Sequence, residues 1–155
     1  MSFEAAKKHL ENRGLGEKIK KFTISSATVE LAAKALSTAP AHIAKSITFT
    51  VDNGPIMVVC AGDAKVNNSK FKAQFNTKAK MLTAEQVKNL IGHQVGGVCP
   101  FGVKDGVKIF LDESLKRFEV VYPACGNSKS AVALTIAELE SSCDYVEWVD
   151  VCNIR

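Results

Sequence analysis

The chain has 155 residues, of which 46% are hydrophobic and 23% charged, and its formal net charge is +4. A chain of this length buries roughly two thirds of its unfolded surface, so one domain needs neither a disulfide nor a metal to fold. No stretch approaches about 18 consecutive apolar residues, and we therefore expect no membrane span. The mildly basic charge is compatible with a polyanionic partner but is weak evidence for one.

Cysteine and histidine usage argues against secretion and against a metal site. Five cysteines occur without a CxxC pair, and the start of the chain has no secretion-signal pattern. We therefore expect reduced thiols in a cytoplasmic protein. The three histidines, His9, His42 and His93, are far apart, and none stands at a zinc-binding spacing from a cysteine or carboxylate. We predict no metal.

The first forty residues predict two helices and a short strand. A helix capped by Ser2 carries its apolar residues on one face and ends near Gly14. Residues 20–24 favour a strand, and apolar residues at helical spacing predict a second helix over 29–36.

A hairpin follows. Lys45 comes just before residues 46–51, which alternate apolar and polar side chains as a half-buried strand does. Asp52-Asn53-Gly54 is a strong turn signal, because Asn-Gly tolerates the positive φ angles of a tight hairpin. The apolar run 56–61 predicts a buried central strand.

The second half predicts further short helices and strands. A helix is expected over 69–75, and capping boxes at Thr83 and Thr135 each begin another. Strands are expected at 107–111, 119–122, 131–134 and 145–151. The whole predicts a single domain, 1–155, of mixed α/β (α+β) class. Its sheet should have about seven strands, mostly antiparallel and barrel-like, with short helices outside. A doubly wound nucleotide fold is disfavoured, since neither GxGxxG nor a phosphate-loop motif is present.

Three loops and one lysine indicate a small polar pocket. Lys45 lies near the predicted ends of strands, as do the glycine-containing segments 62–67 and 96–102. Glycine loops let backbone N–H groups approach a ligand closely or stabilise an oxyanion. The segment 123–128 adds small polar side chains in a turn. These residues alone assign no reaction type.

A thiol nucleophile is an open alternative. Cys99 stands in a glycine-flanked loop, and Cys125 precedes Gly126. Neither has a histidine nearby in sequence, so a catalytic partner would have to be brought in by the fold.

An ordered set of four segments resembles the YbaK-like proteins, which are similar to the editing (insertion) domain of bacterial prolyl-tRNA synthetases. The resemblance covers nearly the whole chain. Its segments are Ala41-His42-Ile43-Ala44-Lys45-Ser46, Gly62-Asp63-Ala64-Lys65-Val66-Asn67, Gly96-Gly97-Val98-Cys99-Pro100-Phe101-Gly102, and Gly126-Asn127-Ser128 before a strand.

The resemblance implies a distorted barrel-like sheet and a trans-editing hydrolase without a cofactor. Its substrate would be mischarged aminoacyl-tRNA, typically tRNA(Pro) carrying alanine, cysteine, serine or a similar small residue. The implied partners are the acceptor end of the tRNA and, as a candidate, prolyl-tRNA synthetase, with no membrane. Lys45 matches the family's lysine, and N–H groups at Gly96 and Gly97 are candidate oxyanion donors. The implied substrate-binding residues are Gly62, Asp63, Asn67, Val98, Cys99, Pro100, Phe101, Gly126, Asn127 and Ser128.

One departure leaves the substrate open. Alanine-specific relatives have a histidine in the late turn, whereas residues 125–130 here contain none. Two other functions also stay open. The first is a non-catalytic binding module for tRNA ends or a synthetase partner, and the second is a cysteine-dependent hydrolase using Cys99.

Overall fold

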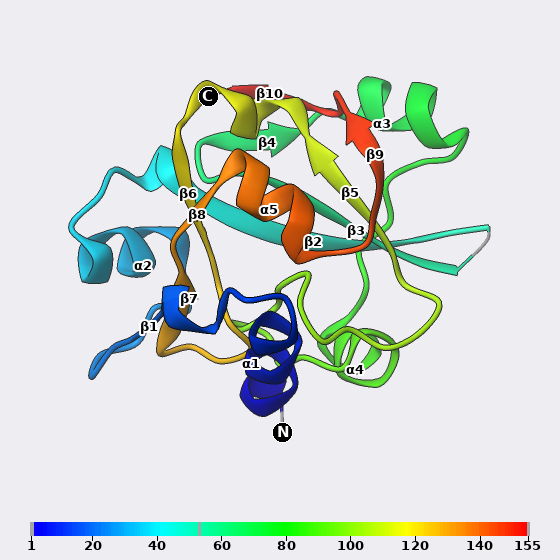
Figure 1. Cartoon of the computed structure of the whole chain (residues 1–155). Helices are drawn as coiled ribbons and strands as arrows, with labels where there is room; N and C mark the ends of the chain where they lie inside the picture. Colours follow the sequence, from blue (N-terminus) through cyan, green and yellow to red (C-terminus); the bar gives the residue numbers. More distant parts are fainter. Residues whose placement is uncertain (1, 53, 155) are drawn as a thin grey trace.

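The computed structural model describes residues 2–52 and 54–154. Its centre is a curled six-stranded sheet in the order β8-β6-β2-β3-β5-β9, with short helices around it (Figure 1). The strands of this sheet are β2 (Ile43–Val51), β3 (Gly54–Ala61), β5 (Lys108–Asp112), β6 (Val120–Pro123), β8 (Leu134–Thr135) and β9 (Tyr145–Val149). Two small antiparallel sheets pair β1 (Ile19–Lys21) with β7 (Ser130–Val132), and β10 (Cys152–Ile154) with β4 (Ala64–Val66).

The hairpin at the centre of the sheet follows from its sequence pattern. β2 and β3 pair antiparallel from Ala44 opposite Ala61 to Val51 opposite Gly54. The predicted turn residue Asn53 lies outside the described residues. β3 is buried from Ile56 onward, which confirms it as the central strand.

The predicted mixed class and barrel-like mixed sheet are confirmed, but the six-stranded sheet is not mostly antiparallel, since three of its five pairings are parallel. Of the seven pairings between described strands, four are antiparallel and three are parallel. The parallel pairs are β2 with β6, β3 with β5, and β5 with β9. The described residues form ten strands rather than about seven, because two predicted strands each divide between sheets and β4 is not among the predicted strands.

These divisions are corrections to the sequence analysis. The strand expected at 131–134 is split, since Ala133 donates its N–H to Lys18 O at 3.1 Å between β7 and β8. The strand expected at 145–151 ends at Val149, and β10 then pairs with β4 instead. Sequence alternation does not reveal a change of partner strand.

The helices cover the sheet on both faces, with α1 and α4 below it and α3 above it in Figure 1. They are α1 (Ser2–Asn12), α2 (Val29–Leu36), α3 (Asn68–Phe75), α4 (Ala84–Gln86) and α5 (Ile136–Ser142). Short helical turns are η1 (Gly16–Lys18), η2 (Pro40–His42), a π-helical turn η3 (Val87–Ile91) and η4 (Glu113–Arg117). No helix of the described part of the chain is long and apolar enough to cross a bilayer.

Helix ends follow the predicted chemistry at most positions. Both capping boxes form, with Thr83 accepting from Gln86 N and Thr135 accepting from Glu138 N. Ser2 is different, because it lies within α1 and its hydroxyl contacts His93 Nδ1 at 2.6 Å and the Gly126 carbonyl. This hydroxyl therefore joins α1 to distant loops.

Candidate active site

The candidate site is a cavity of about 270 Å³ against β2. Its wall consists of residues 43–48 of β2, residues 26–29 with Ala32, the segment Met81, Leu82, Ala84 and Val87, the turn residues Val95, Gly96 and Val98, and Tyr122, Ala124, Ser130 and Ala131. Lys45 is the one charged residue among the described residues that line it. Five segments that are far apart in sequence therefore meet around this lysine.

Lys45 lies within β2, as its third residue, and not before the strand as the sequence predicts. Its strand begins early because residues 43 and 44 pair with β6, and Lys45 itself stands opposite Cys60 of β3. The side chain is half-buried, and its ammonium donates to the carbonyl of Ala64 on β4. Since an ammonium has three N–H donors, this contact leaves two for a ligand.

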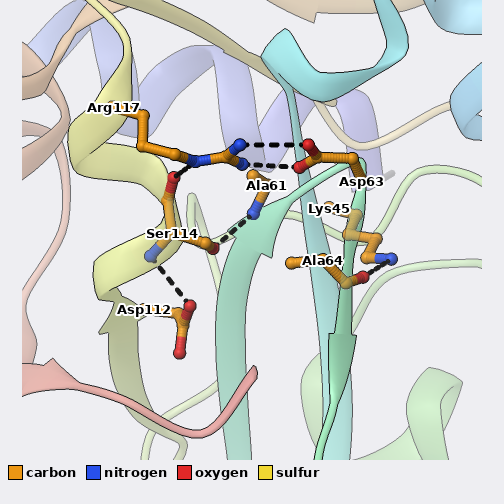
Figure 2. Close-up of polar contacts among 7 residues, drawn as sticks. All are labelled: Lys45, Ala61, Asp63, Ala64, Asp112, Ser114 and Arg117. Carbon is orange, nitrogen blue, oxygen red and sulfur yellow. Dashed lines mark hydrogen bonds and ion pairs between the residues drawn. The ribbon is translucent and has the colours of Figure 1, made fainter. Parts of the chain in front are cut away.

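An ion pair fixes the turn beside Lys45. The guanidinium of Arg117 holds Asp63 through two contacts, at 3.0 Å from Nη1 and 2.5 Å from Nη2. Figure 2 shows the Lys45 ammonium directed at Ala64 and away from this pair. The hydrogen bond from Arg117 holds the pKa of the Asp63 carboxyl below its ordinary value.

Asp63 thus has a structural partner for its carboxylate. Its neighbour Gly62 is packed so closely that a Cβ there would lie 1.9 Å from Pro40 O. Asn67 caps α3 by accepting from Lys70 N at 3.0 Å. Within the described residues, these three predicted binding residues do not line the cavity. Gly62 and Asp63 form the β3–β4 turn that precedes Ala64, whose carbonyl accepts from Lys45, whereas Asn67 begins α3.

The two predicted oxyanion donors differ. Gln94 to Gly97 form a turn closed by Gly97 N–H to Gln94 O at 3.0 Å, in which Gly96 has a φ of 95°. Positive φ at the third turn position favours glycine. Gly96 lines the cavity, and among the described residues its N–H has no backbone acceptor.

Gly97 does not fit the predicted catalytic role. Its N–H is committed to Gln94, and a Cβ at this position would lie 2.4 Å from Asn127 N. Its carbonyl accepts from Gly126 N at 3.0 Å, which ties the two glycine loops together. We assign Gly97 to loop packing.

The segment after Gly97 runs from the cavity into the core. Val98 lines the cavity, whereas Cys99, Pro100 and Phe101 are buried behind it. The fold does bring a histidine to Cys99, since His93 Nε2 lies 3.5 Å from its sulfur. This nitrogen also lies 2.7 Å from Phe101 O, an acceptor, so it carries a proton in that contact.

Neither candidate thiol is poised for nucleophilic attack. Complete burial raises the pKa of the Cys99 thiol far above its ordinary value, and burial raises the pKa of Cys125 to about 12. The nucleophile of a cysteine hydrolase is a thiolate, which these environments disfavour at neutral pH. The geometry therefore argues against the cysteine-dependent alternative.

The late turn supports the cavity wall from behind. Ser128 O accepts from Ser26 Oγ at 2.9 Å, and Asn127 Oδ1 accepts from Ser130 Oγ at 2.7 Å. Ser26 and Ser130 line the cavity, whereas Gly126, Asn127 and Ser128 are not among the described lining residues. Asn127 and Ser128 therefore contact residues that line the cavity and do not line it themselves.

Sequence reasoning missed several wall residues. Ser46 is half-buried while its Oγ is covered and has no hydrogen-bond partner among the described residues. Its position on the polar face of 46–51 is the sequence signal that could have identified it. The segment 81–87 carried no such signal, because only tertiary packing brings it to β2 through Leu82 N–H to Thr48 O at 3.1 Å.

Comparison with known proteins agrees with this architecture. The model of the family described as aminoacyl-tRNA editing domain matches residues 24–141, which include Lys45 and all the other described residues that line the cavity. The chain belongs to this family.

Its relatives include free-standing proteins and parts of larger enzymes. An uncharacterized protein, YwhH of Bacillus subtilis (strain 168), is 41% identical over 154 residues, covering 99% of this chain and 98% of YwhH. A proline–tRNA ligase of Geobacillus sp. (strain WCH70) is 32% identical over 129 residues, covering 83% of this chain. The match spans only 22% of that ligase.

Solved structures of editing-domain relatives have the same fold. One, proposed to be a trans-editing enzyme for prolyl tRNA synthetase, superposes with a TM-score of 0.88 at 26% identity. The superposition covers 98% of this chain and 97% of that chain. The similarity of the chain to the editing domain of prolyl-tRNA synthetases is therefore present in both sequence and fold.

Proposed function

We propose that this protein is a trans-editing hydrolase that deacylates mischarged aminoacyl-tRNA in the cytoplasm. Residues 1–155 would act as a single editing domain. The observation that carries the proposal is the position of Lys45, the matched family lysine, as the charged residue in the cavity wall. The relative YwhH and the trans-editing structure, each matched over nearly its full length, support action as a separate protein.

The proposed chemistry is stabilisation of charge at an ester carbonyl. Attack on the carbonyl makes a tetrahedral oxyanion, which donors already in place stabilise in a site that excludes water. The two remaining N–H donors of Lys45 and the N–H of Gly96 are the candidates. No aspartate, glutamate, histidine or cysteine is among the described lining residues, so no side chain of the wall is an evident general base. Catalysis would then come from positioning, with water or a group of the substrate as the nucleophile.

The proposed substrate is tRNA(Pro) carrying a small wrong residue such as alanine, cysteine or serine. The proline–tRNA ligase relative supports the choice of tRNA. A cavity of about 270 Å³ with mainly alanine, valine and serine walls supports a small acyl group. Prolyl-tRNA synthetase is a candidate partner on the same grounds.

The test is a panel of tRNA(Pro) species charged with alanine, cysteine, serine or proline. We expect the purified protein to accelerate hydrolysis of at least one mischarged species by about tenfold or more over the spontaneous rate, and to spare prolyl-tRNA(Pro). Tight binding without accelerated hydrolysis of any species would instead favour the non-catalytic binding module.

A further inference from the structure

Two apolar side chains stand exposed at the mouth of the cavity. Among the described residues, Val95 (67% exposed) and Met81 (65% exposed) are the most exposed large hydrophobic residues of the chain. Both line the cavity. Single exposed hydrophobic residues are ordinary on protein surfaces, but the convergence of the two most exposed ones on one pocket needs a cause.

The backbone holds both residues in place. Met81 forms an isolated bridge with Phe49 of β2, and hydrogen bonds on either side, Thr50 N–H to Lys80 O at 2.9 Å and Leu82 N–H to Thr48 O at 3.1 Å, fix its segment. Val95 lies in the turn closed by Gly97 N–H and Gln94 O. The exposed side chains are thus carried on ordered backbone, as a binding surface requires.

The proposed substrate determines what lies at this mouth. An aminoacyl group is joined by its ester directly to the ribose of the terminal adenosine of tRNA. If the acyl group enters the cavity beside Lys45, that adenosine must lie at the entrance. Unstacked bases are held between aromatic or apolar side chains, which contact their flat faces. Methionine suits such a contact because its side chain is flexible and polarizable.

We propose that Met81 and Val95 form an apolar clamp for the terminal adenine of the tRNA. This inference rests on the proposed function and assigns the part of the substrate that the cavity does not enclose. A second copy of the chain or a protein partner would be a different occupant, and the experiment distinguishes them.

The test combines two variants with two substrates. The clamp variant is Met81→Gln with Val95→Thr, which keeps side-chain size and removes apolar surface. The matched control is Leu90→Gln with Val146→Thr, because both residues are exposed, at 42% and 54%, and are not among the cavity-lining residues. The substrates are a mischarged tRNA that ends in adenosine and one that ends in uridine, whose smaller base stacks less.

For wild type, we expect KM for the adenosine-ended substrate to be about tenfold lower than for the uridine-ended one. The clamp variant should raise KM for the adenosine-ended substrate by about tenfold, leave kcat within about threefold, and lose the preference between the two substrates. The control should behave as wild type.

Each other outcome overturns the inference. If the clamp variant has the same KM as wild type for the adenosine-ended substrate, Met81 and Val95 do not hold the terminal adenine. The proposed function is unaffected by that result. If the clamp variant raises KM equally for the adenosine-ended and uridine-ended substrates, the two residues do not recognise the base. If it changes the oligomeric state in size-exclusion chromatography, the surface contacts a second copy of the chain. If wild type hydrolyses neither substrate, the proposed function fails as well.

Discussion

Four of the side-chain hydroxyls on the cavity wall differ in whether they have a hydrogen-bond partner within the protein. A hydroxyl with such a partner supports the fold, whereas one without a partner is a candidate for contact with a ligand. Ser26 donates to Ser128 O, Thr28 caps α2, and Ser130 donates its single hydroxyl proton to Asn127 Oδ1 at 2.7 Å, with the Cys125 carbonyl at 3.2 Å as the alternative acceptor. Ser46 has no such partner in the part of the chain that the structure describes. A buried hydroxyl without a partner costs about 1–3 kcal/mol, so Ser46 does not stabilise the free protein through hydrogen bonding.

The stability of two alanine variants tests this division. Ser46→Ala should be neutral or stabilise the protein by up to about 1 kcal/mol, because it removes a hydroxyl that has no hydrogen-bond partner among the described residues. Ser130→Ala, the matched control, should destabilise it by about 1 kcal/mol or more, since the buried hydrogen bond from its hydroxyl is lost. Urea denaturation measures both free energies of unfolding. Equal destabilisation by the two variants would show that Ser46 has a structural partner after all.

At the scale of elements, His93 connects α1 to the loops that carry the site. Its Nδ1 lies 2.6 Å from Ser2 Oγ of α1, and its Nε2 lies 2.7 Å from Phe101 O. Ser2 also contacts the Gly126 carbonyl, so this one serine links the imidazole to the late turn. Burial lowers the pKa of His93, against the opposing effect of the Phe101 carbonyl. The lowered pKa favours the uncharged ring.

This arrangement predicts a dependence of stability on pH. Because the pKa of His93 in the folded state lies below the ordinary value of 6.5, the unfolded chain binds the proton more readily as pH falls below that value. Stability from His93 is therefore complete above about pH 6.5 and declines as pH falls toward the folded pKa. The depressed pKa values of Asp63 and Asp144 act below 3.8, outside this window.

Denaturation at pH 7.5 and pH 5.5 checks the prediction. Wild type should lose free energy of unfolding between these conditions, and His93→Gln should be less stable at the higher pH with a smaller loss on acidification. A variant with the same pH dependence as wild type would assign the effect to other groups.

For the whole molecule, the sequence predicts what is local and misses what is assembled at a distance. The alternation of 46–51, the turn at 52–54 and the apolar run 56–61 place the central hairpin correctly, because each signal acts within a few residues. The family resemblance points to Lys45, Gly96 and Val98, which do meet at the cavity. Met81 and Val95 reach the cavity only through tertiary packing, which no sequence spacing predicts. For the same reason, the glycine-loop residues 97 and 126–128 resemble a binding site in sequence but pack behind its wall.

The proposed role of Lys45 is measured by the single-turnover hydrolysis of a mischarged tRNA(Pro) by wild type and by Lys45→Ala. We expect Lys45→Ala to lower the rate by at least about tenfold, equivalent to about 1.4 kcal/mol of transition-state stabilisation. Lys45→Arg should also be impaired, because a planar guanidinium replaces a compact ammonium. Thermal melts should show both variants folded, and Cys99→Ser should retain most of the activity. A folded Lys45→Ala variant as fast as wild type, beside an inactive Cys99→Ser variant, would contradict the account.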